Sequence, residues 1–232
     1  MFNNFFSPIH KEGWFILLIL FCLTIVFWHL TPFLGWIGII LFIWGLYFFR
    51  NPARTTPLGD KLIISPADGR LLPVVEVIPP ADLALGTEKR MRLSIFMDVL
   101  DVHVNRIPID GVITHVDYHK GKFINASLDK ASEENERKSF VIQTTNGQKI
   151  GLVQIAGLVA RRIKSPVEVG DEVKAGERFG IIKFGSRVDV YLPLDACITV
   201  IPGQKMVGGE TVMADLNPSV AGAQMVFEGR TS

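Results

Sequence analysis

The chain has 232 residues, with 24 basic and 23 acidic side chains and a formal net charge of +1. This length accommodates one ordinary globular domain and a smaller appendage. Because the charges nearly cancel, no global electrostatic field favours a nucleic-acid partner. Cys22 and Cys197 lie far apart in apolar sequence, as buried free cysteines do, and neither has a Cys or His at metal-ligand spacing. We therefore expect neither a nucleic-acid partner nor a metal site.

Two apolar runs without a formally charged residue, 14–30 and 33–49, fill most of the first fifty residues. Each is about 17 residues long and would form a helix of roughly 25 Å, close to the lower limit for crossing a bilayer. Pro32 stands between them, where proline ends one helix and can begin the next. Two runs fit a signal peptide poorly, whereas a buried soluble hairpin and a re-entrant hairpin stay open. The sequence predicts an N-terminal membrane hairpin of two helices over residues 1–50.

Basic residues flank the two apolar runs on one side only. Lys11 precedes the first run, Arg50 and Arg54 follow the second, and the turn between the runs carries no charge. Under the positive-inside rule, both ends of the hairpin lie on the cytoplasmic side. We therefore expect a protein of the cell membrane whose domain, residues 51–232, faces the cytoplasm.

Residues 51–232 contain short β-branched segments separated by Gly, Pro and Asp turns, a pattern typical of β-strands. One polar segment, Asp129–Lys138, is compatible with a helix or with an exposed loop. The expected strand segments are Lys61–Ser65, Leu71–Ile78, Arg92–Met97, Gly111–Tyr118, Phe140–Thr144 and Ile150–Ile155.

The segment Pro166–Phe184 repeats a strand, a turn and a further strand, with Gly170 and Gly176 at the turns. Glycine gives the backbone the freedom that such tight turns need. The run resembles the "VxxGDxVxxGxxF" stretch of biotinyl and lipoyl carrier domains. The expected fold class is therefore mainly β: a barrel-sandwich domain, lipoyl- or biotinyl-like, preceded by the α-helical membrane hairpin.

A Gly-Ser pair, Gly185 and Ser186, directly follows an apolar strand segment. Most such pairs are strand ends at which the serine is solvated. The pair is also capable of chemistry, because glycine leaves its carbonyl unhindered and the serine hydroxyl can attack it to give an ester. β-Elimination from that ester would cut the chain and leave dehydroalanine, which hydrolyses to a pyruvoyl group. The attack requires a base and donors for the oxyanion.

Two further segments hold residues of the types that activate a nucleophile. Asp68 lies in the turn of SPADGR, and His103 lies between two expected strands in MDVLDVHVNRIP. Taken singly, Asp68 has the pattern of a turn former and His103 that of a hydrogen-bonded histidine at a strand end. Together with Ser186 they supply the carboxylate, imidazole and hydroxyl of a triad.

The chain shows a family resemblance from about Phe48 to about Asp215. The chain resembles the short form of the phosphatidylserine decarboxylase family, and the FGSR and DVHVNR stretches are the most specific parts of the likeness. The matching segments, in order, are FFRNPAR, SPADGR, DVHVNRIPIDG, YHKGKFINASLDKASEENER, VQIAGLVARRI, GDEVKAGERFGIIKFGSRVDVYLP and VGGETVMAD.

The resemblance implies a proenzyme that cuts itself between Gly185 and Ser186. The products would be a β chain of residues 1–185 and an α chain of residues 186–232, which stay associated, and Ser186 would become the pyruvoyl cofactor. Asp68 and His103 would complete the self-processing triad. Larger bacterial members of the family carry LGST in place of FGSR and a second histidine soon after the first. Here Asn105 and Arg106 follow instead, so His103 could serve both processing and catalysis.

The resemblance further implies decarboxylation of phosphatidylserine to phosphatidylethanolamine, through a Schiff base between the substrate amine and the pyruvoyl group. His103 is the first choice as the proton donor that quenches the resulting carbanion, and His119 the second. For the phosphodiester of the lipid, Arg161, Arg162 and Lys164 form one basic cluster, and Arg50 with Arg54 form another.

Three other functions compete with this one. The same chemistry on archaetidylserine is indistinguishable by sequence. A non-catalytic lipoyl-like membrane scaffold would need a lysine at the turn that here reads FGSR, and a zinc peptidase would need His-x-His where Asn105 follows His103. A homo-oligomer stays open.

Overall fold

The computed structural model describes residues 7–121, 134–157, 163–183 and 186–217. The N-terminal hairpin consists of α1, Trp14–Leu30, and α2, Pro32–Phe48, preceded by a short 3-10 helix, η2, at Lys11–Gly13. Thr31 caps α2, because its Oγ1 accepts a hydrogen bond from the backbone N–H of Leu34 at 3.3 Å. The predicted two-helix arrangement over the first fifty residues is thus present.

Small residues bring the two helices together. A Cβ atom at Gly35 would lie 2.2 Å from the Trp28 ring, and one at Gly38 would lie 2.9 Å from the Thr24 Cα. The outward surface is apolar, and Phe33 is 74% exposed. Lys11–Leu30 is long and apolar enough to cross a membrane, and Pro32–Phe48 is apolar but shorter. Large exposed apolar surfaces mark contact with a partner or a membrane, so the hairpin is compatible with membrane association.

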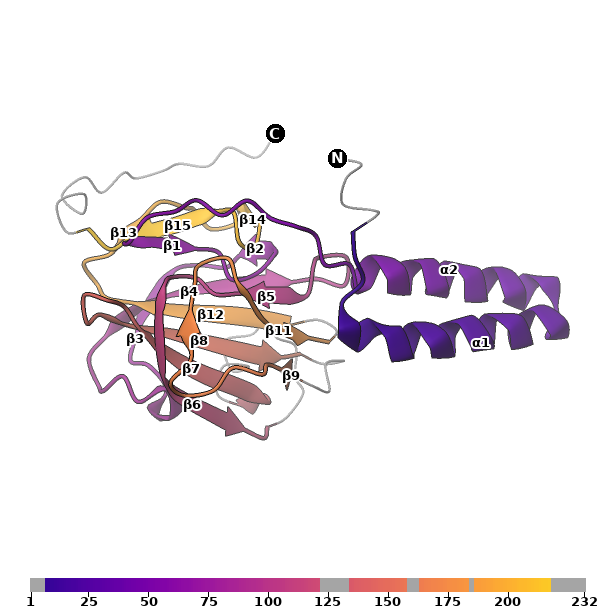
Figure 1. Ribbon diagram of the computed structural model, residues 1–232, viewed down its shortest axis with the longest axis horizontal. Helices are drawn as coiled ribbons and strands as arrows, with labels where there is room; N and C mark the ends of the chain where they lie inside the picture. The colour runs from indigo at the N-terminus through magenta and orange to yellow at the C-terminus, as the bar shows by residue number, and fades with distance from the viewer. Residues whose placement is uncertain (1–6, 122–133, 158–162, 184–185, 218–232) are drawn as a thin grey trace.

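The remainder is mainly β, with a curled, half-barrel sheet (Figure 1). The long sheet contains nine strands, eight of them in the order β10-β6-β7-β8-β12-β4-β2-β14, with β3 paired to β4. In the described part of the chain, two three-stranded sheets, β1-β15-β13 and β5-β11-β9, accompany it. The strands are β1 Leu62–Ile64, β2 Gly69–Leu71, β3 Val75–Val77, β4 Arg90–Met97, β5 Val104–Arg106, β6 Gly111–His119, β7 Arg137–Gln143, β8 Lys149–Ala156, β9 Ile163–Lys164, β10 Glu172–Val173, β11 Arg178–Ile182, β12 Ser186–Leu192, β13 Cys197–Ile198, β14 Lys205–Met206 and β15 Val212–Asp215.

Five of the six expected strand segments correspond to single strands, and the sixth, Leu71–Ile78, is divided between β2 and β3. Pro73 lies in the interruption, and a proline cannot donate a hydrogen bond to a neighbouring strand. The helix considered for Asp129–Lys138 is wrong at its end, because Arg137 and Lys138 begin β7 and pair with both β6 and β8. Residues 129–133 of that prediction lie outside the described residues.

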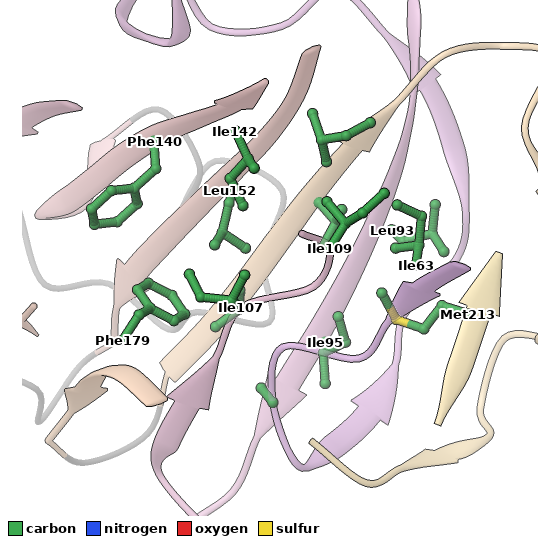
Figure 2. Packing of buried hydrophobic residues seen from close by; sticks show 14 of the residues in the cluster. Ile63, Leu93, Ile95, Ile107, Ile109, Phe140, Ile142, Leu152, Phe179 and Met213 are labelled. Atoms are coloured by element: carbon green, nitrogen blue, oxygen red, sulfur yellow. The ribbon is translucent and has the colours of Figure 1, made fainter. Parts of the chain in front are cut away.

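The main core fills the concave side of the curled sheet. Figure 2 shows part of it, with Phe140 and Phe179 from different sheets lying close to one another. Their ring centroids are 5.5 Å apart and nearly perpendicular, an edge-to-face contact that aromatic pairs prefer. Val188, Val190 and Leu192 of β12 enter the same core. Alternation along β12 therefore directs Ser186 toward the core side, and Arg187 and Asp189 toward the opposite face.

The hairpin is packed onto the β domain at its base. Phe48 and Phe49, fully buried, contact Val102, Val104 and Ile181 in a separate apolar cluster. Val104 lies in β5 and Ile181 in β11, on the side of the domain from which the helices project (Figure 1). The hairpin base therefore forms part of the same packed unit as the strand that leads to Ser186.

Candidate active site

Ser186 is the first residue of β12 and lies in the middle of the long sheet. It pairs with Met97 of β4 and Ala156 of β8, and it is completely buried. Its Oγ makes a weak hydrogen bond to the Met97 Sδ at 4.0 Å. A solvated serine at a turn is therefore excluded. Gly185 and Phe184, on the other side of the expected scissile bond, lie outside the described residues.

Two buried amides lie next to this position. The Asn105 Nδ2 donates to the Met97 Sδ at 3.5 Å, and the Gln154 Nε2 donates to the Asn105 Oδ1 at 2.7 Å. Within the described part of the chain, the Gln154 Oε1 has no hydrogen-bond partner although it is buried. A thioether is a weak acceptor, so this chain of amides retains unused hydrogen-bonding capacity beside Ser186.

His103 precedes β5 and is completely buried under the hairpin. Its ring lies 4.2 Å from the Phe48 ring, centroid to centroid. Its backbone carbonyl accepts a hydrogen bond from the N–H of Ile182, the last residue of β11, so it lies beside the strand that precedes Gly185 and Ser186 in the chain.

The protonation of His103 follows from its contacts. The Nδ1 lies 3.0 Å from the backbone carbonyl oxygen of Asp101, which can only accept, so Nδ1 carries the hydrogen. The Nε2 is buried and has no partner among the described residues. Burial lowers the pKa of His103 to about 4, and the backbone hydrogen bond and charge of Asp101 only partly oppose this. At neutral pH, His103 is thus an uncharged imidazole with an available lone pair at Nε2.

Asp68 forms its hydrogen bonds with Arg54 and Gly208. Its carboxylate accepts one hydrogen bond from the Arg54 Nη2 and one from the Gly208 N–H, both at 2.8 Å. Burial raises the pKa of Asp68 above its ordinary value, although Arg54 and the Gly208 hydrogen bond lower it. Among the described residues, no hydrogen bond joins Asp68 to His103 or Ser186. The structure thus places Asp68 where it ties the segment after the hairpin to the β domain.

Further hydrogen bonds hold the segment that follows the hairpin. The Arg106 Nη2 donates to the Pro52 carbonyl at 2.7 Å and its Nη1 to the Gly176 carbonyl at 2.7 Å. The Arg50 Nη2 donates to the Leu100 carbonyl at 2.8 Å. Since Leu100 lies three residues before His103, these contacts connect the base of the hairpin with the His103 segment. Arg50 and Arg54, considered as lipid-binding residues, are used here in protein contacts.

The two other candidates that the structure describes, Lys164 and His119, lie apart. Lys164 is exposed in β9 and pairs with Ile181 of β11, near the hairpin base. His119 is the exposed last residue of β6, and β7 and β8 separate it from β12. Arg161 and Arg162 lie outside the described residues. The structure therefore brings Lys164, but not His119, to the side of the sheet where β11 and β5 meet.

A buried ion pair lies on the face of β12 opposite Ser186. The Arg187 Nε and Nη2 donate to the two carboxylate oxygens of Asp189 at 2.6 and 2.7 Å, and both side chains are excluded from water. Removing one partner of such a pair leaves an uncompensated buried charge. Both partners belong to β12, so the pair neutralises the charge that is buried on this face of the strand.

Several of these residues were missed by sequence reasoning. Gln154 carried a signal, because it is a polar residue within the apolar strand segment that became β8. Phe48 carried none, since it belongs to a uniformly apolar run.

Comparison with known proteins gives one consistent result. A family model described as phosphatidylserine decarboxylase matches residues 41–214. A protein of Rickettsia bellii (strain OSU 85-389), named phosphatidylserine decarboxylase proenzyme, is 49% identical over 227 residues, which cover 98% of each chain. A protein of the same name from Rickettsia akari (strain Hartford) is 49% identical over 99% of each chain. Another, from Rickettsia africae (strain ESF-5), is 51% identical over 92% of this chain and 93% of the relative.

Proposed function

The chain belongs to the phosphatidylserine decarboxylase family, and we propose that it converts phosphatidylserine into phosphatidylethanolamine and carbon dioxide. The near-complete coverage of relatives with that name supports the reaction. The observation that carries the mechanism is the Ser186 hydroxyl, which is excluded from water and whose acceptor among the described residues is a thioether. Such a hydroxyl is not stabilised by strong hydrogen bonds and is available for reaction.

The proposed first step is self-cleavage between Gly185 and Ser186. The Ser186 Oγ forms an ester bond with the Gly185 carbonyl carbon as the amide C–N bond breaks, and the hydroxyl proton passes through a base to the amine nitrogen. Loss of the Ser186 Cα proton then breaks the Cβ–O bond, releasing the Gly185 carboxylate and leaving dehydroalanine. Water enters and ammonia leaves, so residue 186 becomes a pyruvoyl group. The name proenzyme in the relatives is consistent with processing into two chains.

His103 is the proposed base. Its Nε2 lone pair is unprotonated at neutral pH and lies in a buried site next to β11, which leads to the scissile bond. The same nitrogen, once protonated, can return a proton to the substrate carbon after carbon dioxide has left. Asp68 is proposed to act indirectly, because its carboxylate fixes Arg54 and the segment around it. His119 is the alternative proton donor.

A pyruvoyl group fits the surroundings of residue 186. The Asn105 Nδ2 is spent on a thioether, and the Gln154 Oε1 and the His103 Nε2 are buried without a partner in the described part of the chain. A carbonyl at residue 186 could accept a hydrogen bond from the Asn105 Nδ2 in place of the thioether. The Gln154 Oε1 and the His103 Nε2 are acceptors, so they could accept hydrogen bonds from the substrate amine. The group supplies an electrophilic carbonyl for the substrate amine and a sink for the electrons that decarboxylation releases. Asn105 and Gln154 would orient the reacting atoms and exclude water.

The pH dependence of self-cleavage follows from the lowered pKa of His103. Protonation removes the Nε2 lone pair, so the rate should be constant from pH 8 down to about pH 5 and should halve near the pKa of about 4. The rate is measured on freshly synthesised chain moved to each pH, followed on denaturing gels, with circular dichroism to verify that the chain remains folded. A midpoint near 6.5, the ordinary value of histidine, would contradict a buried base.

We further propose how the chain lies at the membrane and how its two products stay together. Residues 1–50 would insert in the cell membrane and residues 51–232 would form the decarboxylase domain on the cytoplasmic side, supported by Lys11, Arg50 and Arg54 at one end of the hairpin. Chains 1–185 and 186–232 would stay associated, because β12 is paired along its length with β4 and β8.

We also propose that the β domain is a barrel-sandwich of the lipoyl and biotinyl class. This class is supported by the turns at Gly170 and Gly176, whose φ angles of 97° and 79° lie in the left-handed region that favours glycine.

Archaetidylserine is an alternative substrate with the same headgroup chemistry.

The function is tested with the purified wild-type protein, hairpin included, in vesicles that contain phosphatidylserine labelled in the serine carboxylate. Release of labelled carbon dioxide with equimolar phosphatidylethanolamine is the expected result. Prior treatment with phenylhydrazine, which reacts with carbonyl groups, should abolish the release. Turnover that survives this treatment would overturn the pyruvoyl mechanism, and absence of turnover on phosphatidylserine with turnover on its ether analogue would reassign the substrate.

A further inference from the structure

A pocket of about 460 Å³ lies at the base of the hairpin. It is lined by the segment before α1, by β9 and the residues after it, and by β11. The side chains that concern its chemistry are His10, Lys11, Glu12, Lys164 and Arg178. These come from three parts of the chain that are distant in sequence, so the pocket exists only when the hairpin is docked on the β domain.

The lining of this pocket is positively charged. Lys11, Lys164 and Arg178 contribute three cations, and the acidic lining residue, Glu12, is paired with the Lys183 Nζ at 2.9 Å. Among the described residues, neither Lys11 nor Lys164 forms an ion pair. The pKa of His10 is lowered first by burial and further by the charges of Lys11, Lys183 and Arg178, against an increase from Glu12. The cations around this hollow outnumber its one acidic lining residue, and such a hollow attracts an anion.

Arg178 is held in place before any ligand arrives. Its Nε donates to the Asn51 Oδ1 at 2.6 Å and its Nη2 to the Pro52 carbonyl at 3.4 Å. Both partners are uncharged, so the guanidinium retains its charge for an external anion. Planar guanidinium groups bind phosphate oxygens in a defined geometry, and a fixed side chain loses less entropy on binding.

One wall of the pocket is in contact with the amides of the active site. A Cβ atom at Gly180 would lie 3.0 Å from the Gln154 Nε2 and 2.7 Å from the Lys164 carbonyl oxygen. Gln154 in turn leads through Asn105 and Met97 to Ser186. An anion in the pocket would therefore be separated from the amide chain by a single strand without a side chain at that point.

The position of the pocket relative to the hairpin indicates which kind of anion it binds. α1 begins at Trp14, directly after the pocket segment, and the helices project from this side of the domain (Figure 1). With the hairpin inserted in a bilayer, the pocket lies at the depth of the lipid headgroups. We propose that this pocket binds the phosphodiester of a glycerophospholipid, with Lys11, Lys164 and Arg178 as its cationic ligands. The proposal rests on the proposed function only in placing the hairpin in a membrane.

The test measures binding of short-chain lipids to the full-length Ser186→Ala chain in a non-ionic detergent, so that no turnover interferes. The probes are dihexanoyl phosphatidylglycerol, dihexanoyl phosphatidylserine and inorganic phosphate, titrated by calorimetry. Lys11→Gln and Lys164→Gln should each weaken binding of both lipids about fivefold, as expected for one basic residue near an anionic headgroup. Lys164→Arg should retain affinity, and Lys149→Gln, an exposed lysine at the start of β8, should leave it unchanged.

The outcomes separate the sources of the phosphate. A rise in KM for phosphatidylserine without a change in kcat in Lys164→Gln assigns the pocket to the substrate's own phosphodiester. Weakened phosphatidylglycerol binding with an unchanged KM assigns it to a second, accessory lipid. The proposal would be overturned if inorganic phosphate bound as tightly as the two lipids. It would also be overturned if the lipid affinities did not change in Lys11→Gln and Lys164→Gln. Because phosphatidylglycerol carries no carboxylate to lose, its binding tests the pocket even if the proposed decarboxylation fails.

Discussion

Replacing Ser186 by alanine should leave a single full-length chain and abolish release of carbon dioxide from phosphatidylserine. The substitution removes the only atom of the side chain that can attack the Gly185 carbonyl, and without cleavage no pyruvoyl group forms. The cavity left by one oxygen is small, and the Oγ makes only a weak contact to the Met97 Sδ, so the fold should be retained. Denaturing gels and the labelled carbon dioxide assay measure both effects on one preparation.

The matched control for this substitution is Ser94→Ala. Ser94 is also a buried serine, it lies in β4 directly beside β12, and its Oγ has no hydrogen-bond partner among the described residues. This variant should be cleaved and active like the unmodified chain. Decarboxylation by uncleaved Ser186→Ala would refute the role of Ser186, and loss of cleavage in Ser94→Ala would attribute the effect to packing.

Replacing His103 by glutamine should slow self-cleavage by about 10²–10⁴-fold, the range that a positioned general base contributes. Any cleaved enzyme that accumulates should also decarboxylate more slowly, because the same Nε2 is proposed to return the proton to the substrate. Glutamine keeps a polar side chain of similar size that can still donate to the Asp101 carbonyl, but it offers no base at the Nε2 position. The two rates are measured separately, by gel and by carbon dioxide release.

The control for His103 is His115→Gln. The His115 Nε2 also lies within hydrogen-bond distance of a backbone carbonyl, that of Asp82 at 2.9 Å, but it is on β6, away from Ser186. Both variants are compared by thermal unfolding, since His103 packs against Phe48. Cleavage at an undiminished rate in His103→Gln would exclude this histidine as the base. Equal losses in both variants would indicate a general effect on folding.

Local signals in the sequence were sufficient for much of the fold. The apolar runs around Pro32 predicted the two helices, and β-branched segments between turns predicted most of the strands. The order of the strands was beyond such reasoning, because it depends on contacts between distant residues. Ser186 pairs with Met97 and Ala156, which are far away in sequence, and only that pairing shows that its hydroxyl is buried.

The sequence suggested candidate residues for the site but gave no information on their contacts. His103 was expected near a carboxylate of Asp68, whereas the structure connects Asp68 to Arg54 and leaves His103 with the Asp101 carbonyl. The sequence could not indicate that Phe48, at the end of an apolar helix, covers the His103 ring. The apolar side chain of Phe48 is equally compatible with lipid contact and with protein packing. Only the structure, in which the hairpin is docked on the β domain, shows that it packs against protein.

The central claim is that the chain cuts itself before Ser186 and converts this residue into a pyruvoyl group, and intact mass spectrometry of the purified wild-type chain tests it most directly. The account predicts two fragments, one ending at Gly185 and one of residues 186–232 whose mass is lower than that of a free serine terminus by one ammonia. A full-length chain as the sole species in a preparation that decarboxylates phosphatidylserine would contradict it.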